Sequence, residues 1–154
     1  MQQIYLDNAS TTFPKPQVVA DAVYQYITHA GNNISRGTCA TSSENLVYTT
    51  RELLCEFFGA EDSKNVIFTK NVTESLNIVI KGLLRIGDHV LVSAMEHNAV
   101  MRPLQQIGTE LTADNAPADA ITFSRIPCDA ESALRLDALP QLIRPNTRAI
   151  IMTH

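Results

Sequence analysis

Two strand-to-helix junctions of this sequence carry side chains that could bind a small molecule. The first is TKNVTES, residues 69–75, where an apolar run passes into a helical pattern. Backbone N–H groups at a helix start, together with the Thr73 and Ser75 hydroxyls, would suit a phosphate group. Spacing alone also allows Thr73 simply to cap the helix. The sequence has no GxGxxG motif and no Walker A lysine, so the common nucleotide fingerprints are absent.

The second junction places Glu96 and His97 directly after the apolar run HVLVS. An imidazole there could stack on a flat ring or transfer protons near neutral pH. The alternative is that His97 is a helix cap or a surface residue. A further polar segment, residues 5–12, contains Asp and Asn that could do no more than form a turn.

The elements that must position these residues follow from the periodicity of apolar side chains. Helices are expected over 16–27, from a Ser42 or Ser43 cap to Gly59, and over 73–84, 98–107 and 136–143. Strands are expected over 65–69, 89–93, 120–127 and 148–154, and a surface loop over 108–120. Short apolar strands alternating with helices predict an α/β fold with a parallel sheet covered by helices.

Composition excludes several classes of protein. A length of 154 residues suits one domain, and 45% hydrophobic residues argue against disorder. A net charge of -4 disfavours nucleic-acid binding, and no stretch approaches the roughly 20 apolar residues that span a membrane. The 3 cysteines show no CxxC spacing, so neither a disulfide framework nor a metal site is expected. With no signal-peptide pattern at its start, the chain is predicted to be cytoplasmic.

Five segments of the sequence, taken together and in order, indicate a protein family more specifically than any one of them does. They are YLDNASTTFPKP, SRG at 35–37, VIFTKNVTESLN, GDHVLVSAMEHNAVMRPL and IRPNTRAIIMTH. In this order they resemble the N-terminal portion of class V aminotransferase-fold enzymes, most nearly the cysteine desulfurase and selenocysteine lyase branch. The resemblance covers nearly the whole chain except residues 109–120.

The resemblance implies a pyridoxal 5′-phosphate (PLP) enzyme of fold type I. Residues 1–154 would form the N-terminal part of its large domain, with a mostly parallel sheet, and the family works as a homodimer. The matching positions imply three cofactor-phosphate residues, Val72, Thr73 and Glu74. His97 would stack on the pyridine ring and could also act as an acid or base. By the same resemblance, Asn8, Ala9 and Arg36 would lie near the substrate entrance.

The implied reaction converts L-cysteine to L-alanine and transfers sulfur to an enzyme thiol as a persulfide, with a sulfur-acceptor protein as a possible partner. Another class V activity, an aminotransferase or a selenocysteine lyase, stays open. A further alternative also stays open, in which the chain is a non-catalytic, truncated remnant that acts only in association with another protein chain.

The chain departs from the family pattern in two places. Cys39 stands where relatives often carry a histidine, which leaves a substrate-side contact in doubt. The family's cofactor-bearing lysine and its C-terminal remainder have no counterpart before His154, and Lys70 would face the phosphate. We therefore expect this chain alone to be inactive. The low 18% of charged residues is consistent with an exposed sheet edge, dimer face and cofactor cleft.

Overall fold

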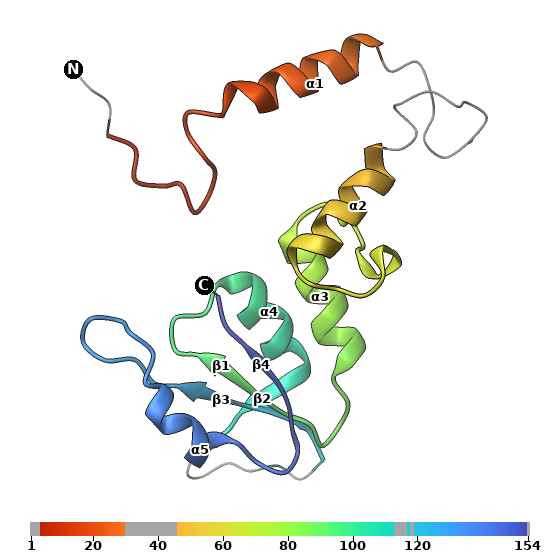
Figure 1. Cartoon of the computed structure of the whole chain (residues 1–154). Helices are drawn as coiled ribbons and strands as arrows, with labels where there is room; N and C mark the ends of the chain where they lie inside the picture. The colour runs from red at the N-terminus through yellow and green to blue at the C-terminus, as the bar shows by residue number, and fades with distance from the viewer. Residues whose placement is uncertain (1–3, 30–45, 113–116, 118, 154) are drawn as a thin grey trace. The chain divides into compact units, whose positions relative to one another are not determined.

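The computed structural model describes residues 4–29, 46–112, 117 and 119–153, and the chain divides into two compact units. The first unit, Met1–Ile67, contains α1 (Gln17–His29), α2 (Leu46–Phe57) and the 3-10 helix η1 (Ser63–Asn65) (Figure 1). The two helices expected in this part of the chain are thus confirmed. Gly59 follows α2 with a φ of 63°, a left-handed conformation that suits glycine. The expected caps Ser42 and Ser43 lie outside the described residues.

The second unit, Phe68–His154, is built on a parallel sheet. Its strands are β1 (His89–Ser93), β2 (Gly108–Glu110), β3 (Ile121–Ile126) and β4 (Thr147–Ile151), in the order β2-β3-β1-β4. Every pairing between these four strands is parallel, as predicted. The helical segments are α3 (Val72–Leu83), α4 (Asn98–Ile107), the 3-10 helix η2 (Leu136–Ala138) and α5 (Leu139–Leu142).

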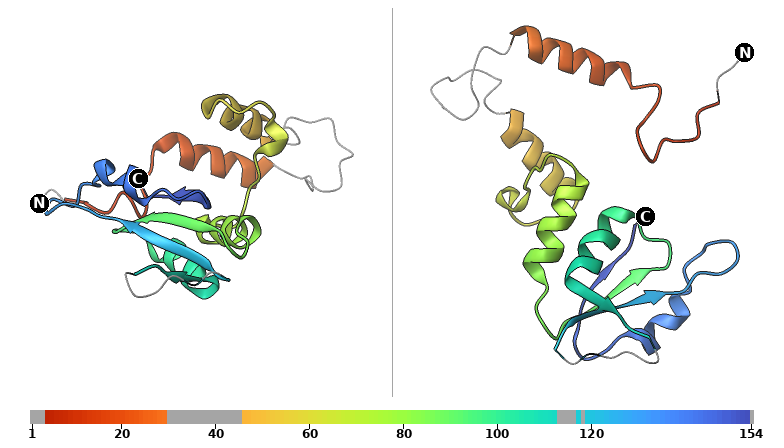
Figure 2. Two further views of the ribbon diagram at one scale, coloured as in Figure 1. Left: turned by 90° about the horizontal axis from the view of Figure 1, so that it is seen from below. Right: turned by 180° about the vertical axis from the view of Figure 1, so that it is seen from behind.

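The core of this unit lies between the sheet and the helices α3 and α4. The helices contribute Ile80 and Leu104, and the strands contribute Val90, Val92 and Phe123, all buried in one cluster. In both helices the apolar residues recur at three and four positions, so one face of each helix meets the sheet. Figure 2 shows α4 on one side of the sheet and α5 on the other. Among the described helices, none has the length and apolar character needed to cross a bilayer.

Three predicted elements differ in the structure. Residues 65–69 do not form a strand: they pair with no described strand, and Ile67 is 76% exposed. Residues 108–120 are not entirely loop, because Gly108–Glu110 forms β2 alongside β3. An added Cβ on Gly108 would lie 3.1 Å from the Ile121 carbonyl oxygen, so glycine permits this close pairing. The helix expected over 136–143 is a 3-10 turn followed by one short α-helical turn.

A fully buried histidine joins three strands of the sheet. The Nδ1 atom of His89 lies 2.9 Å from Oγ1 of Thr147 on β4, and its Nε2 lies 3.0 Å from Oγ of Ser124 on β3. Both ring nitrogens therefore have hydrogen-bond partners in the interior, as a buried polar side chain requires.

This histidine predicts a loss of stability in mild acid. Burial, followed by the positive charge of Arg144, lowers the pKa of His89 below its ordinary value of 6.5. The folded state therefore prefers neutral imidazole, whereas the unfolded chain gains a proton as the pH falls below about 6.5. The contribution of His89 to the free energy of unfolding should be fully present above that pH. It should decline as the pH falls from there to the folded-state pKa. Urea unfolding at pH 7.5, 6.5 and 5.5 measures the effect, and His89→Leu should flatten the slope. An equally steep slope in that variant would assign the effect to another group.

Candidate functional site

The start of α3 is capped by Asn71. This residue is extended, with φ of -167° and ψ of 169°, and its Oδ1 accepts a hydrogen bond of 2.9 Å from the backbone N–H of Glu74. In return, Oε2 of Glu74 accepts a 2.7 Å hydrogen bond from the N–H of Lys70. The pair resembles a capping box shifted by one residue. The alternative that Thr73 caps this helix is therefore wrong.

Capping by Asn71 leaves several donors at this helix end available. The N–H groups of Val72 and Thr73 come before that of Ser75, which bonds to the Asn71 carbonyl at the start of the helix, so they have no acceptor in the preceding turn. Within the described part of the chain, the Thr73 hydroxyl makes no hydrogen bond, whereas the Ser75 hydroxyl is bonded to Thr69. An anion at this end would also meet the positive end of the helix dipole. Of the two hydroxyls that the sequence suggested, Thr73 is the one in a position to bind a ligand.

His97 occupies the equivalent position on α4. It is the N-cap of this helix, with φ of -69° and ψ of 150°, and its Nδ1 accepts a 3.0 Å hydrogen bond from the N–H of Ala99. The capping alternative for His97 is therefore confirmed. Because Nδ1 accepts this bond, the ring proton is assigned to Nε2. The cap fixes one edge of the ring, and among the described residues Nε2 has no hydrogen-bond partner.

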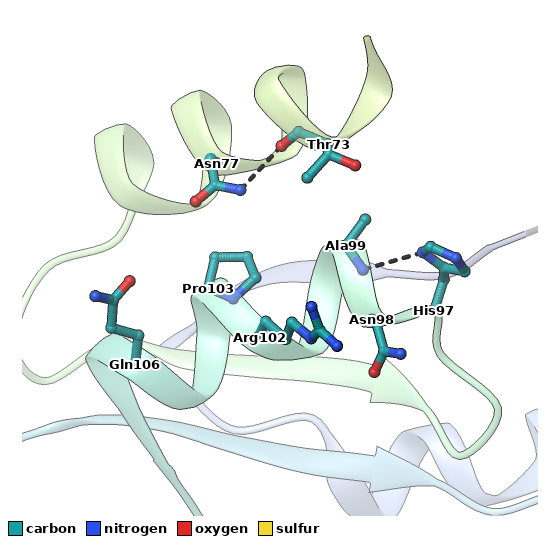
Figure 3. A pocket seen from close by; sticks show the side chains of 8 residues that line it. All are labelled: Thr73, Asn77, His97, Asn98, Ala99, Arg102, Pro103 and Gln106. Atoms are coloured by element: carbon teal, nitrogen blue, oxygen red, sulfur yellow. Dashed lines mark hydrogen bonds between the residues drawn. The ribbon is translucent and has the colours of Figure 1, made fainter.

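Thr73 and His97 line one cleft between α3 and α4, with a volume of about 440 Å³ (Figure 3). That volume is within the usual range for small-molecule sites. Asn77 and Arg102 also line it, and Nδ2 of Asn77 donates a 2.9 Å hydrogen bond to the Thr73 carbonyl. Sequence analysis missed both residues. The position of Asn77, one helical turn after Thr73, is the signal that could have found it.

Glu96, next to His97, is fully engaged by hydrogen-bond donors. Oε1 accepts from Oγ of Ser93 and from the backbone N–H of Thr153, each at 2.7 Å, and Oε2 accepts from Oγ1 of Thr153 at 2.8 Å. Burial by itself would raise the pKa of Glu96, but these bonds, with a contribution from the nearby His97 backbone, lower it overall. The group is thus held as a carboxylate rather than as a proton donor.

The residues predicted for the substrate entrance lie in the first unit or outside the described residues. Oδ1 of Asn8 accepts a 3.2 Å hydrogen bond from the N–H of Phe13, and Ala9 lies in the turn over residues 8–10. The turn-forming role of this segment is therefore confirmed. The placement of Asn8 and Ala9 at a substrate entrance stays a prediction. Arg36 and Cys39 lie outside the described residues.

Comparison with known protein families decides the relationship. The model of the family described as Aminotransferase class-V matches residues 4–154. The chain belongs to this family. Among class V relatives, a probable cysteine desulfurase of Vibrio cholerae is 32% identical over 157 residues. That alignment covers 98% of this chain but only 37% of the relative, so the chain spans little more than a third of its length.

Solved structures agree with this class V assignment. The apo structure of a cysteine desulfurase from Thermococcus onnurineus matches with a TM-score of 0.76 and 27% identity. The match covers 97% of this chain and 36% of that one. A mutant of C-DES, solved with glycine covalently linked to its PLP cofactor, matches with a TM-score of 0.55 and 23% identity. This match covers 90% of our chain and 34% of the C-DES chain, and at this sequence identity it supports the fold alone. The predicted α/β fold, as part of a type I large domain, is confirmed.

Proposed function

We propose that this chain is the N-terminal part of the large domain of a PLP-dependent cysteine desulfurase. The observation that carries the proposal is that Thr73 and His97, from separate segments, line the same cleft. In the reaction, L-cysteine and an enzyme thiol give L-alanine and an enzyme persulfide. The C–S bond of the substrate breaks and an S–S bond forms. The similarity to cysteine desulfurases of Vibrio cholerae and Thermococcus onnurineus, the first of them a probable one, supports cysteine as the substrate.

The residues at the α3 end of the cleft suit a phosphate. Its oxygens would accept from the N–H groups of Val72 and Thr73 and from the Thr73 hydroxyl. Glu74, the third residue predicted for this site, has its N–H bonded to Asn71 and its carboxylate bonded to Lys70. We propose that Glu74 holds the loop in shape, which keeps the other donors pointing outward.

His97 would contact the ring of the same cofactor. With Nδ1 bonded to the Ala99 N–H, the imidazole can stack as a flat group and present Nε2 to the substrate side. A proton on Nδ1 would break the cap, so the geometry favours stacking and hydrogen-bond donation from Nε2. PLP, when bound, supplies an electron sink for the substrate amino acid.

The remaining predictions extend this proposal. Asn8, Ala9 and Arg36 would act on the substrate side. The whole protein would be a cytoplasmic homodimer that passes sulfur to an acceptor protein. For the chain alone we propose binding without turnover, because no lysine of this sequence is suited to carry the cofactor. Lys70 adjoins the phosphate-binding end of α3, Lys81 lies in the last turn of that helix, and Lys15 and Lys64 belong to the first unit.

The proposal is tested by mixing the purified chain with PLP, with pyridoxal, and with PLP plus L-cysteine. We expect PLP to bind more tightly than pyridoxal, because only PLP has the phosphate, and we expect no alanine above the protein-free background. Equal affinity for the two aldehydes would contradict the phosphate site. Alanine formed at enzyme-like rates, or a borohydride-fixed adduct on Lys70, would contradict the proposed inactivity of the chain.

A further inference from the structure

The carboxylate of Glu96 ties together three segments of the chain that meet at the cleft end of the sheet. We propose that Glu96 is a positioning residue, which holds His97 in place by anchoring the β1–α4 loop to the chain that leaves β4. The functional part of this inference rests on the proposed function, since it takes His97 as the residue that faces the cofactor.

The geometry of the anchor is specific to Glu96. One oxygen accepts from Ser93, the last residue of β1, and from the backbone of Thr153, while the other accepts from the Thr153 hydroxyl. Thr153 lies two residues beyond the end of β4, and β4 is bonded to β1. The carboxylate therefore fastens the loop to a strand end that is remote in sequence but adjacent in the sheet.

The anchor is connected directly to His97. Glu96 immediately precedes His97 in the chain, and the His97 backbone is among the groups that lower the pKa of Glu96. His97 is thus fixed on its N-terminal side by the anchored Glu96, to which it is covalently joined, while its ring is held on the other side by the Ala99 N–H. A shift of the Glu96 side chain would release the backbone at the N-cap, and the ring could no longer keep its orientation over the cleft.

Charge makes this anchor strong. Hydrogen bonds to an ionised carboxylate are shorter and stronger than neutral ones, and those to Glu96 measure 2.7 to 2.8 Å. The side chain is only partly exposed, so the removal of the carboxylate would leave several donors without their acceptor. A glutamine could retain part of the anchor, because the Thr153 hydroxyl can reverse and accept from the new amide group.

A matched control exists at the opposite edge of the sheet. Glu110 on β2 accepts from Nε and Nη2 of Arg125 on β3 at 2.7 and 3.2 Å. Like Glu96, it is a half-buried carboxylate that joins two elements of the second unit. Within the part of the chain that the structure describes, its carboxylate bonds to Arg125 alone, so Glu110→Ala removes a comparable anchor without touching His97.

The test measures amide hydrogen exchange at Ala99 and Thr153 in the whole chain, by NMR, for Glu96→Ala, Glu96→Gln and Glu110→Ala. We expect exchange at both amides to become roughly tenfold faster or more in Glu96→Ala, given the usual strength of hydrogen bonds to charged groups. Glu96→Gln should recover part of the protection, and Glu110→Ala should leave both amides as in the parent chain. If Glu96→Ala does not fold, Thr153→Val removes the hydroxyl contact alone and should give a smaller change of the same kind.

Unchanged exchange in Glu96→Ala, or an equal change in Glu110→Ala, would overturn the inference. The exchange readout needs no PLP, so it does not depend on whether the proposed function holds. PLP titration then adds the functional part, and weaker PLP binding in Glu96→Ala than in Glu110→Ala is the expected result. Faster exchange at Ala99 together with unaltered PLP affinity would overturn the functional part of the inference, because the anchor would then hold His97 without affecting cofactor binding.

Discussion

Replacement of Phe123 by alanine is expected to lower the free energy of unfolding of the second unit by about 3–5 kcal/mol. Phe123 is 1% exposed and lies in β3, within the cluster formed by the sheet and the helices α3 and α4. Strands on both sides of β3 hold its backbone in place, so the structure could not easily collapse into the space left by the ring. The cost should therefore include both the lost burial and the cavity.

Urea unfolding followed by circular dichroism measures this loss. Ile86→Ala is the control, because Ile86 is 76% exposed in the turn before β1 and its truncation should cost no more than about 0.5 kcal/mol. Similar losses for the two variants would mean that the cluster around Phe123 does not form the stabilising core.

Replacement of Thr73 by alanine is expected to weaken PLP binding by roughly ten- to a hundredfold, the usual worth of a hydrogen bond to a charged group. The hydroxyl has no hydrogen bond within the described residues, so its removal leaves no protein donor or acceptor unsatisfied. The loss should therefore appear in ligand affinity and hardly at all in stability. Pyridoxal, which lacks the phosphate, should bind both chains equally.

Ser75→Ala is the matched control for this measurement. Its hydroxyl lies on the same helix but is already bonded to Thr69, so the change should reduce stability slightly and leave PLP affinity unaltered. Absorbance titration with PLP and with pyridoxal distinguishes the cases. If Thr73→Ala weakened the binding of PLP and pyridoxal equally, the Thr73 hydroxyl would not be acting on the phosphate group.

The sequence was most informative where a side-chain period and a strand end coincide. The helices α3 and α4 and the strands β1, β3 and β4 follow from apolar periodicity, and Thr73 and His97 follow from their places after apolar runs. The cap of α3 could not be chosen from sequence, because Asn71 and Thr73 are both good capping residues. The extended backbone at Asn71 decides between them.

The errors concern interactions between distant segments. Residues 65–69 have strand-forming side chains but no described strand beside them, whereas the polar Gly108–Glu110 becomes a strand because β3 offers it an edge. Strand propensity depends on the local sequence, whereas strand pairing depends on a partner strand that tertiary structure brings alongside. The hydrogen bonds of Glu96 could not be predicted from the sequence for the same reason. Its main partner, Thr153, lies beside it only because β1 and β4 pair.

The strand order also determines the sequence of events during synthesis. The inner strand β1 is made first, and its neighbours β3 and β4 follow later in the chain. All of its residues end up buried, so the newly made β1 is an apolar strand with both edges open until the later strands emerge. Such a segment is prone to aggregation until β3 and β4 have been synthesised and have paired with it. A chain that stops before Thr147 would leave one edge of β1 permanently unpaired and should be recovered mainly as aggregate.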